Sequence, residues 1–273
     1  MDYTKLNGLR NIARALGINK LLTYPARRRA AERMRIYERD KPKVADFELE
    51  GKSIRMHVTN AFEWMRVQSF YEDQHIISAI KAHLPENGTF WDVGSSIGLY
   101  SNYLAKVVGN QGKVIAFEPE IRSREKLMAN IALNNNNQIR ICPVGLGKET
   151  ATFKMILAED ASAGNHRLSD HVESGELTQE VQVYGADEYR QQENLPQPNV
   201  VKIDVEGFEE GVILGARHTL SSPECRAVIV EVHFAILSGK GDSDAPRRIV
   251  EHLRTYGFKE TSWIDSSHLI AVK

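Results

Sequence analysis

The sequence predicts an α/β fold built on a mainly parallel sheet that finishes in an antiparallel pair of strands. Through the middle of the chain, short runs rich in β-branched and aromatic residues alternate with helical segments, as in βαβ units. Several runs, such as AVIVEV, are apolar at nearly every position, which is typical of strands buried on both faces. The last residues, GFKETSWIDSSHLIAVK, have the pattern of two strands joined by a short turn.

The bulk properties indicate a globular protein in a reducing compartment. The 273 residues suffice for one large α/β domain with an N-terminal extension. A net charge of −1 argues against a uniformly cationic nucleic-acid binder, so we expect no nucleic-acid partner. Cys142 and Cys225 lie in or beside apolar strand-like runs, which favours reduced core thiols. Because no signal-peptide core or membrane-length apolar run is found, we expect a cytoplasmic protein.

The N-terminal segment differs from the rest, and we predict a basic helical extension over residues 1–45 before a domain over residues 46–273. The first 40 residues contain ten Lys or Arg against four acids. Apolar residues from Leu6 to Leu16 recur at helical spacing, Pro25 breaks the pattern, and the arginine-rich segment resumes it. One interpretation is a helix that packs one face on the domain and exposes its basic side chains. The other is a patch that contacts anionic membrane lipid, nucleic acid or a partner protein.

The domain is expected to begin with a hairpin, since DFELEGKSIRMHV alternates around Gly51-Lys52. A helix is predicted from about Tyr71 to Ala82, and Tyr71 and Glu72 are expected to close one wall of a ligand cleft. The predicted parallel strands are TFWDV, KVIAFEP, QIRICPV, VVKIDVE and AVIVEVH. The segments SIGLYSNYLAKVV, IRSREKLMANIALNN and EEGVILGARHTLSS are expected to be the helices between them.

An irregular segment follows the third of these strands. ATFKMIL and EVQVYGA are predicted to be strands that extend the edge of the sheet. The stretch between them, AEDASAGNHRLSDHVESGELTQ, is polar and rich in turn residues. Such an insertion is typical of either mobile surface or a lid over a site.

The stretch FWDVGSSIGLY, residues 90–100, is the main candidate for a ligand site. It has the pattern of a strand turning into a helix, and open α/β sheets bind ligands beyond the carboxyl ends of their strands. Gly94 allows an unusual backbone conformation and Gly98 allows close approach of helix and strand. A dinucleotide fingerprint needs glycine at positions 94, 96 and 99, where this chain has Gly94, Ser96 and Leu99, so two of the three glycines are missing. The Gly-Lys-Ser/Thr of a P-loop does not follow either. The turn therefore indicates a nucleoside without a pyrophosphate.

Acidic residues near this turn narrow the choice of ligand. Glu118 lies 24 residues after Gly94 at a strand end, where it is placed to bind ribose hydroxyls; the alternative is a solvated strand-end acid. Asp92 either caps the helix, fixes the glycine loop or faces a cationic ligand group. S-adenosylmethionine, an adenosine that carries a sulfonium and an amino acid, fits these features. The predicted cofactor-binding residues are Asp92, Gly94, Ser95, Ser96, Gly98, Glu118 and Pro119.

Five motifs give the chain a family resemblance. In FWDVGSSIGLYS, VIAFEP, LMANIALNN, VVKIDVEGFEEGVILGA and VIVEVH it resembles the FkbM-type S-adenosylmethionine-dependent methyltransferases over residues 47–273. IDVEGFE is the most specific, since ordinary class I methyltransferases lack it. The family's turn is closer to D-x-G-A-N-x-G, and Ser95 and Ser96 replace its small and amide residues. The resemblance implies a Rossmann-like, class I sheet of seven strands that ends in the antiparallel pair; it implies nothing about residues 1–40.

The expected chemistry is an in-line displacement at the methyl group, in which a base removes the proton of a hydroxyl acceptor. The ends of the fourth and fifth strands should face the methyl group and supply Asp204, Glu206, Glu209, Glu231 and His233. We predict Asp204, His233 and Glu206 as catalytic residues, with Asp204 or His233 as the base. Alternatively, the acids only complement the following helix dipole and His233 is a neutral strand-end histidine. We expect no metal, although Asp204, Glu206 and His233 are an alternative ligand set for Mg or Mn.

The resemblance favours an O-methyltransferase that acts on a hydroxyl of a sugar, glycolipid or polyketide-like metabolite. The partner would then be a small-molecule, glycan or lipid acceptor, with peripheral membrane contact through the basic N-terminus as a further hypothesis. One alternative is a non-catalytic S-adenosylmethionine-binding scaffold that docks to a membrane or a glycosyltransferase. Another is an NAD(P)-dependent oxidoreductase, against which the missing glycines argue.

Overall fold

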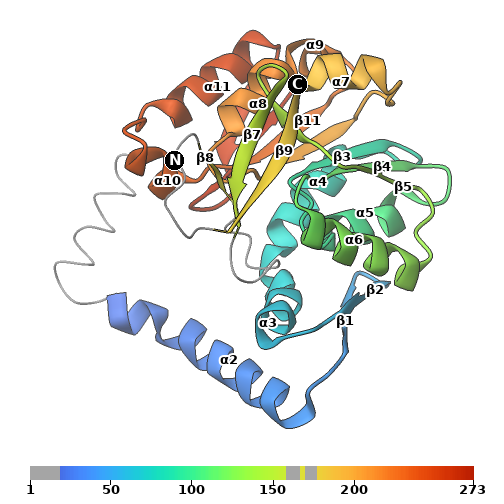
Figure 1. The fold of residues 1–273 in the computed structure, drawn as a ribbon, viewed down its shortest axis with the longest axis vertical. Helices are drawn as coiled ribbons and strands as arrows, with labels where there is room; N and C mark the ends of the chain where they lie inside the picture. Colours follow the sequence, from blue (N-terminus) through green and yellow to red (C-terminus); the bar gives the residue numbers. More distant parts are fainter. Residues whose placement is uncertain (1–18, 158–166, 170–176) are drawn as a thin grey trace.

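The computed structural model describes residues 19–157, 167–169 and 177–273, and its centre is a seven-stranded sheet. The strand order is β12-β13-β11-β10-β3-β4-β5, and its β3-β4-β5 end can be followed in Figure 1. The strands from β11 to β5 in this order are parallel to one another. Strand β13 pairs antiparallel with both β11 and β12, which confirms the predicted fold class. The bounds are β3 Thr89–Val93, β4 Lys113–Phe117, β5 Ile139–Cys142, β10 Val200–Ile203, β11 Ala227–Glu231, β12 Glu260–Trp263 and β13 His268–Val272.

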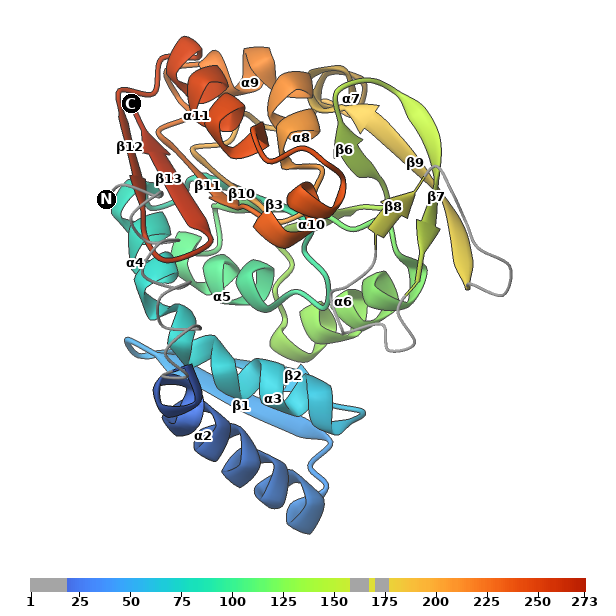
Figure 2. The same cartoon turned by 90° about the vertical axis from the view of Figure 1, so that its left-hand side faces the viewer.

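Helices cover both faces of this sheet (Figure 2). Because successive residues of a strand point to opposite faces, Phe90 of β3 packs in the core with α4 and α5, whereas Trp91 and Val93 pack in the core with α8 and α11. Both faces of the sheet are therefore buried, as the apolar runs predicted. The bounds are α4 Gln74–His83, α5 Leu99–Val108, α6 Ile121–Asn134, α7 Ala186–Gln192, α8 Glu209–Gly215, α9 Arg217–Ser221, α10 Phe234–Gly239 and α11 Ala245–Thr255.

The predicted hairpin is present, formed by β1 (Val44–Leu49) and β2 (Lys52–His57). Its two-residue turn is Glu50-Gly51, one position earlier than expected, and φ is 51° and 72° at these residues. Positive φ at both central positions is what a tight hairpin with the normal strand twist requires. After α3 (Ala61–Ser69), the helix predicted from Tyr71 is found as the 3-10 turn η1 (Phe70–Asp73) continued by α4.

Helix α2 (Asn19–Asp40) precedes the hairpin and packs against α3 (Figure 2). It continues through residue 25, so the proline does not end the helix as the sequence suggested. The helical pattern of residues 6–16 lies outside the described residues, and the division of the chain near residue 45 stays a prediction. Among the helices described, none has the length and apolarity needed to cross a membrane.

The strands after β5 do not extend the central sheet, and this prediction was wrong. β7 (Ala151–Ile156) and β9 (Thr178–Gly185) pair antiparallel in a separate sheet of order β6-β9-β7-β8. The other members are β6 (Gly145–Gly147) and β8 (Arg167–Ser169). Strand β6 pairs with β9 rather than with β5, so the chain leaves the central sheet there. Most of the polar stretch between β7 and β9 lies outside the described residues.

Candidate active site

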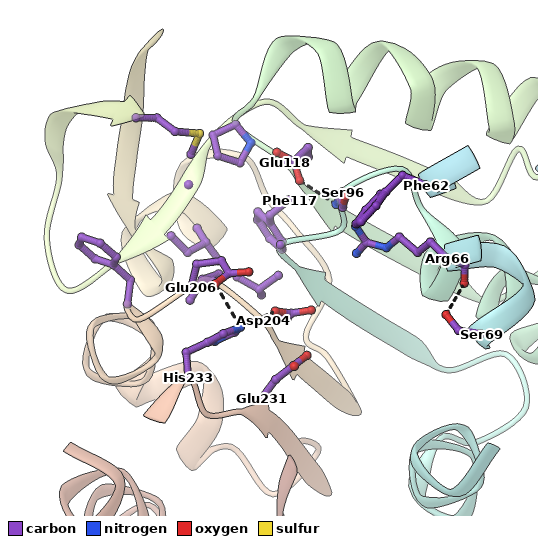
Figure 3. A pocket seen from close by; sticks show the side chains of 18 of the residues that line it. Phe62, Arg66, Ser69, Ser96, Phe117, Glu118, Asp204, Glu206, Glu231 and His233 are labelled. Carbon is purple, nitrogen blue, oxygen red and sulfur yellow. Dashed lines mark hydrogen bonds and ion pairs between the residues drawn. The ribbon is translucent and has the colours of Figure 1, made fainter. Parts of the chain in front are cut away.

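A cavity of about 540 Å³ lies at the carboxyl ends of β3, β4, β10 and β11 (Figure 3). The neighbouring strands β3 and β10 continue into α5 and α8, which pack on opposite faces of the sheet. Such a switch point leaves a crevice between the two connections. The fold therefore places the cavity where the sequence predicted a ligand site.

The glycine turn after β3 forms one wall of this cavity. Its backbone is held to β4, because the amides of Gly94 and Ser95 both donate to the carbonyl of Phe117, at 3.0 and 3.1 Å. Gly94 has φ +85°, and a Cβ there would overlap the carbonyl oxygen of Asp204. The ends of β3 and β10 are in direct contact here, so only glycine fits at position 94.

The predicted residues of this turn have different positions. Gly94 and Ser96 line the cavity, and the buried Oγ of Ser96 has no hydrogen-bond partner among the described residues. Asp92 lies behind the turn, where its Oδ2 accepts a hydrogen bond from Ser101 at 2.5 Å. Ser95 and Gly98 are also behind the surface that faces the cavity. We therefore expect Asp92, Ser95 and Gly98 to shape the turn and Ser96 to contact a ligand.

Glu118 lies at the end of β4 with only 6% of its surface exposed, and it lines the cavity. Its two carboxylate oxygens accept the backbone N–H of Ser96 at 2.7 Å and of Glu120 at 2.9 Å. Burial raises the pKa of Glu118 to about 7, although these two amides oppose the shift. Each oxygen keeps a further lone pair that a ribose hydroxyl can use.

An apolar slot continues from Glu118 towards β6 and β7. The predicted residue Pro119 lines it, together with Val144, Leu146 and Met155. The slot has the character expected for a flat heteroaromatic ring, since it buries apolar surface beside a polar edge.

The opposite end of the cavity is acidic and surrounds one histidine. His233, which follows β11, places its Nε2 3.4 Å from Glu206 Oε2 and 3.7 Å from Asp204 Oδ1. Its Nδ1 is 2.6 Å from Oε1 of the fully buried Glu209. Glu231 also lines this end (Figure 3). The structure thus brings together the three residues predicted to be catalytic.

The groups of this cluster differ in proton affinity. Burial lowers the pKa of His233, but the hydrogen bond that its ring donates to Glu209 and the charges of Asp204 and Glu206 outweigh it and raise the pKa to about 9. Burial raises the pKa of Glu206 to about 7. Burial also disfavours the charge of Asp204, yet Lys202 and His233 hold its pKa at about 2. At neutral pH, Asp204 is therefore ionised and Glu206 is close to its titration midpoint.

Lys202 contacts this cluster from below, and the sequence analysis missed it. It is 1% exposed, donates to Asp204 Oδ2 at 2.9 Å, and lies over the ring of Tyr100 at 4.6 Å. Burial lowers its pKa, but the charges of Asp204, Glu231 and Asp92 raise it by more. The signal was a lysine within VVKIDV, at a position where the pattern requires a buried side chain.

The wall formed by α2 and α3 was also missed. Ala30 and Arg33 of α2, and Phe62, Met65, Arg66 and Ser69 of α3, all line the cavity. Arg66 extends beside Phe62 towards the side of the cavity where Ser96 lies (Figure 3). Glu72 lines the cavity as predicted, and it pairs with Arg33 at 3.2 Å. Tyr71 is not among the described residues that line the cavity, and its hydroxyl accepts a hydrogen bond from the backbone amide of Glu48.

Comparisons with known proteins agree with this geometry. The sequence profile described as the methyltransferase FkbM domain matches residues 92–260. The hexuronic acid methyltransferase AglP of Haloferax volcanii is 29% identical over 191 residues, which cover 69% of this chain and 74% of that protein. Methyltransferase 1 of Beauveria bassiana is 25% identical over 62% of this chain and 73% of its own length.

The solved structures that match this chain include fibrillarin of Aeropyrum pernix with bound S-adenosylmethionine. The match has a TM-score of 0.45 and 13% sequence identity, and it covers 84% of this chain and 93% of the fibrillarin chain. A SAM-dependent methyltransferase of Aquifex aeolicus has a TM-score of 0.43 and 11% identity, covering 77% and 94%.

The fold and the site define a methyltransferase that uses S-adenosylmethionine. The chain belongs to the FkbM methyltransferase family, since the family profile covers more than half of it. The lining of the cavity has groups suited to this cofactor: we expect the apolar slot to hold the adenine, Glu118 the ribose and Ser96 Oγ the methionine portion, with carboxylates near the sulfonium. The individual contacts of the seven predicted cofactor-binding residues stay predictions.

Proposed function

We propose that this protein transfers the methyl group of S-adenosylmethionine to a hydroxyl oxygen of a carbohydrate acceptor. The observation that carries the proposal is the cluster of Asp204, Glu206 and His233 at the acidic end of the cofactor cavity. A hydroxyl group is a poor nucleophile until its proton is removed, and a carboxylate with a suitable pKa can accept that proton.

Glu206 is the best candidate for the base. Its pKa of about 7 is close to the expected working pH, where a general base is most effective. Asp204, with a pKa of about 2, is too weak a base, and His233, with a pKa of about 9, is already protonated at neutral pH. This assignment replaces the sequence-based preference for Asp204 or His233 with the third residue of the predicted set.

The remaining residues of the cluster then position the acceptor. Bound S-adenosylmethionine would supply an activated methyl group at the acidic end of the cavity. Lys202 fixes the Asp204 carboxylate through Oδ2, so that Asp204 can orient the acceptor. Glu206 would take the proton of the acceptor hydroxyl as the methyl group passes from the sulfur to that oxygen. The α2–α3 wall limits access of water to the reacting atoms.

Two observations favour a sugar acceptor, and among sugars an acidic one. A relative at 29% identity is a hexuronic acid methyltransferase. Arg33 and Arg66 belong to the α2–α3 wall of the cavity, and guanidinium groups bind carboxylates well. We expect the sugar carboxylate to lie at this wall, with a ring hydroxyl directed towards Glu206.

The experiment is a transfer assay with S-adenosylmethionine labelled in its methyl group. Purified protein is offered a glucuronic-acid-terminated oligosaccharide and, as the matched control, the same oligosaccharide ending in glucose. We expect label in the acidic acceptor that resists mild alkali, because a methyl ether is stable there and a methyl ester is not. Alkali-labile label would mean transfer to the carboxylate instead, and label in protein alone would contradict the proposal.

A further inference from the structure

We propose that Asp204, Glu231 and His233 bind a divalent cation of the Mg²⁺ or Mn²⁺ type, which holds the acceptor oxygen for methyl transfer. The proposed role of the ion rests on the function proposed above, whereas its binding does not. One ligand atom from each of these residues can be chosen so that all lie within 4.8 Å of one another. All three residues line the cavity, so the site is open to an entering ligand.

The chain fixes the histidine and the aspartate from behind. His233 Nδ1 is 2.6 Å from Glu209 Oε1, which leaves Nε2 facing the cluster. Asp204 Oδ2 accepts from Lys202 at 2.9 Å, which leaves Oδ1 3.7 Å from that Nε2. Metal-binding histidines commonly have a carboxylate on the other ring nitrogen, which sets the ring orientation and raises its basicity.

The third ligand is fixed in the same way. Glu231 Oε2 is 3.3 Å from His268 Nε2, and His268 Nδ1 is 2.9 Å from Asp265 Oδ2. Glu231 is the last residue of β11 and His233 follows two positions later, so both lie at the carboxyl end of this strand. The ligand set that the structure supports therefore contains Glu231 in place of the Glu206 considered from sequence.

The spacing suits a six-coordinate ion. At metal–ligand distances of about 2.1 Å, octahedral geometry places ligand atoms about 3.0 Å apart when adjacent and about 4.2 Å apart when opposite. The separation of 3.7 Å between Asp204 Oδ1 and His233 Nε2, with all three ligand atoms within 4.8 Å of one another, needs only small side-chain shifts.

A buried carboxylate lies directly behind the histidine. Glu209 is 0% exposed, and its Oε2 has no hydrogen-bond partner within the described structure. A buried carboxylate with an unpaired oxygen is costly unless a cation lies nearby. In the ion-free protein that cation is the protonated His233, and a metal ion that replaces the proton on Nε2 would keep positive charge within one imidazole ring of Glu209.

In this site the ion would bind the acceptor oxygen, and a separate carboxylate would remove its proton. A cation that binds a hydroxyl oxygen lowers the hydroxyl pKa and fixes its direction of attack. Glu206 is outside the ligand set but lies 3.4 Å from His233 Nε2, and it can take the proton released from the bound hydroxyl.

The test is a titration of chelator-treated full-length protein with Mn²⁺, in which free Mn²⁺ is followed by electron paramagnetic resonance without cofactor or acceptor. We expect one Mn²⁺ per chain, and at least tenfold weaker binding for Glu231→Gln. Glu206→Gln is the matched variant at the adjacent carboxylate and should keep its Mn²⁺ affinity. Glu260→Gln, an exposed carboxylate on β12, controls for non-specific binding.

The possible results are distinguishable. Absence of saturable Mn²⁺ binding to the wild type, or equal loss in Glu206→Gln and Glu231→Gln, overturns the proposed site, and the wild-type titration decides this even if a variant does not fold. If Mn²⁺ binds as expected but no carbohydrate is methylated in its presence, the site stands and the proposed function fails. If carbohydrate is methylated equally with Mg²⁺ and with excess chelator, the function stands and the metal proposal fails.

Discussion

Replacing Lys202 with methionine should strongly destabilise the protein, because this lysine supplies the positive charge beneath the acidic end of the cavity. Its ammonium is 2.9 Å from Asp204 Oδ2 and 4.6 Å from the centre of the Tyr100 ring, and the side chain is 1% exposed. Removing one partner of a buried ion pair costs about 3–5 kcal/mol, and we expect the lower end of this range because His233 still faces Asp204, whose side chain is 21% exposed. Methionine has a similar volume, so little of the loss should come from a cavity.

Urea unfolding followed by tryptophan fluorescence measures this effect. At a slope of about 2–3 kcal/mol per molar urea, the expected loss lowers the midpoint by more than about 1 M. Lys113→Met, at an exposed position of β4, is the matched control and should change stability by less than about 0.5 kcal/mol. Adding Asp204→Asn to Lys202→Met should restore part of the loss by removing the unpaired charge. A loss below about 1 kcal/mol in Lys202→Met would refute the role given to this pair.

Further predictions concern the cofactor and pH. Glu118→Gln should weaken S-adenosylmethionine binding by about 10–100-fold in calorimetry, because hydrogen bonds to a charged group contribute about 1.5–3 kcal/mol; unchanged affinity would exclude the ribose contact. Since the pKa of Glu118 is about 7, wild-type affinity should increase as pH rises through 7, and Glu118→Gln should lack this dependence. Gly94→Ala should prevent correct folding or cofactor binding, because its Cβ would overlap the Asp204 carbonyl; near-normal binding would contradict the described turn. The pKa of His233 is raised to about 9, so its contribution to the stability of the metal-free protein is complete below about pH 6.5 and is lost as pH rises through 9; unfolding curves of His233→Gln should not show that loss.

Much of the central sheet could be predicted because its strands are buried on both faces. The run TFWDV was expected to be a strand and is β3, Thr89–Val93. In such a sheet the apolar pattern alone defines the strand, and the glycine turn marks where it ends. The positions of Asp204, Glu206 and His233 followed from the same logic, since adjacent parallel strands end at the same edge.

The second sheet and the α2–α3 wall could not be predicted in this way. The runs of β7 and β9 have ordinary strand patterns, and these patterns do not say which strand is the neighbour. Arg33 and Arg66 lie on amphipathic helices, where a cavity-facing arginine and a solvent-facing arginine look the same in sequence. Their position depends on how α2 packs against α3, which is a tertiary contact without a local signature.

Ion pairs also changed the chemical interpretation of single residues. Asp204 was expected to be a candidate base, but Lys202 and His233 hold its pKa at about 2. Glu206 was expected to be a secondary catalytic residue, and burial raises its pKa to about 7. A sequence shows which groups can titrate, but their proton affinities depend on neighbours and burial in the folded chain.

The most direct test of the central claim compares wild type with Glu206→Gln in two measurements made on the same preparations. Cofactor binding is measured by calorimetry, and methyl transfer is measured with labelled cofactor and the glucuronic-acid-terminated acceptor. We expect Glu206→Gln to bind the cofactor within about threefold of wild type and to lose transfer by about 10²–10⁴-fold, the usual contribution of a general base. Transfer by Glu206→Gln at the wild-type rate would contradict the assignment of this acidic cluster to hydroxyl methylation.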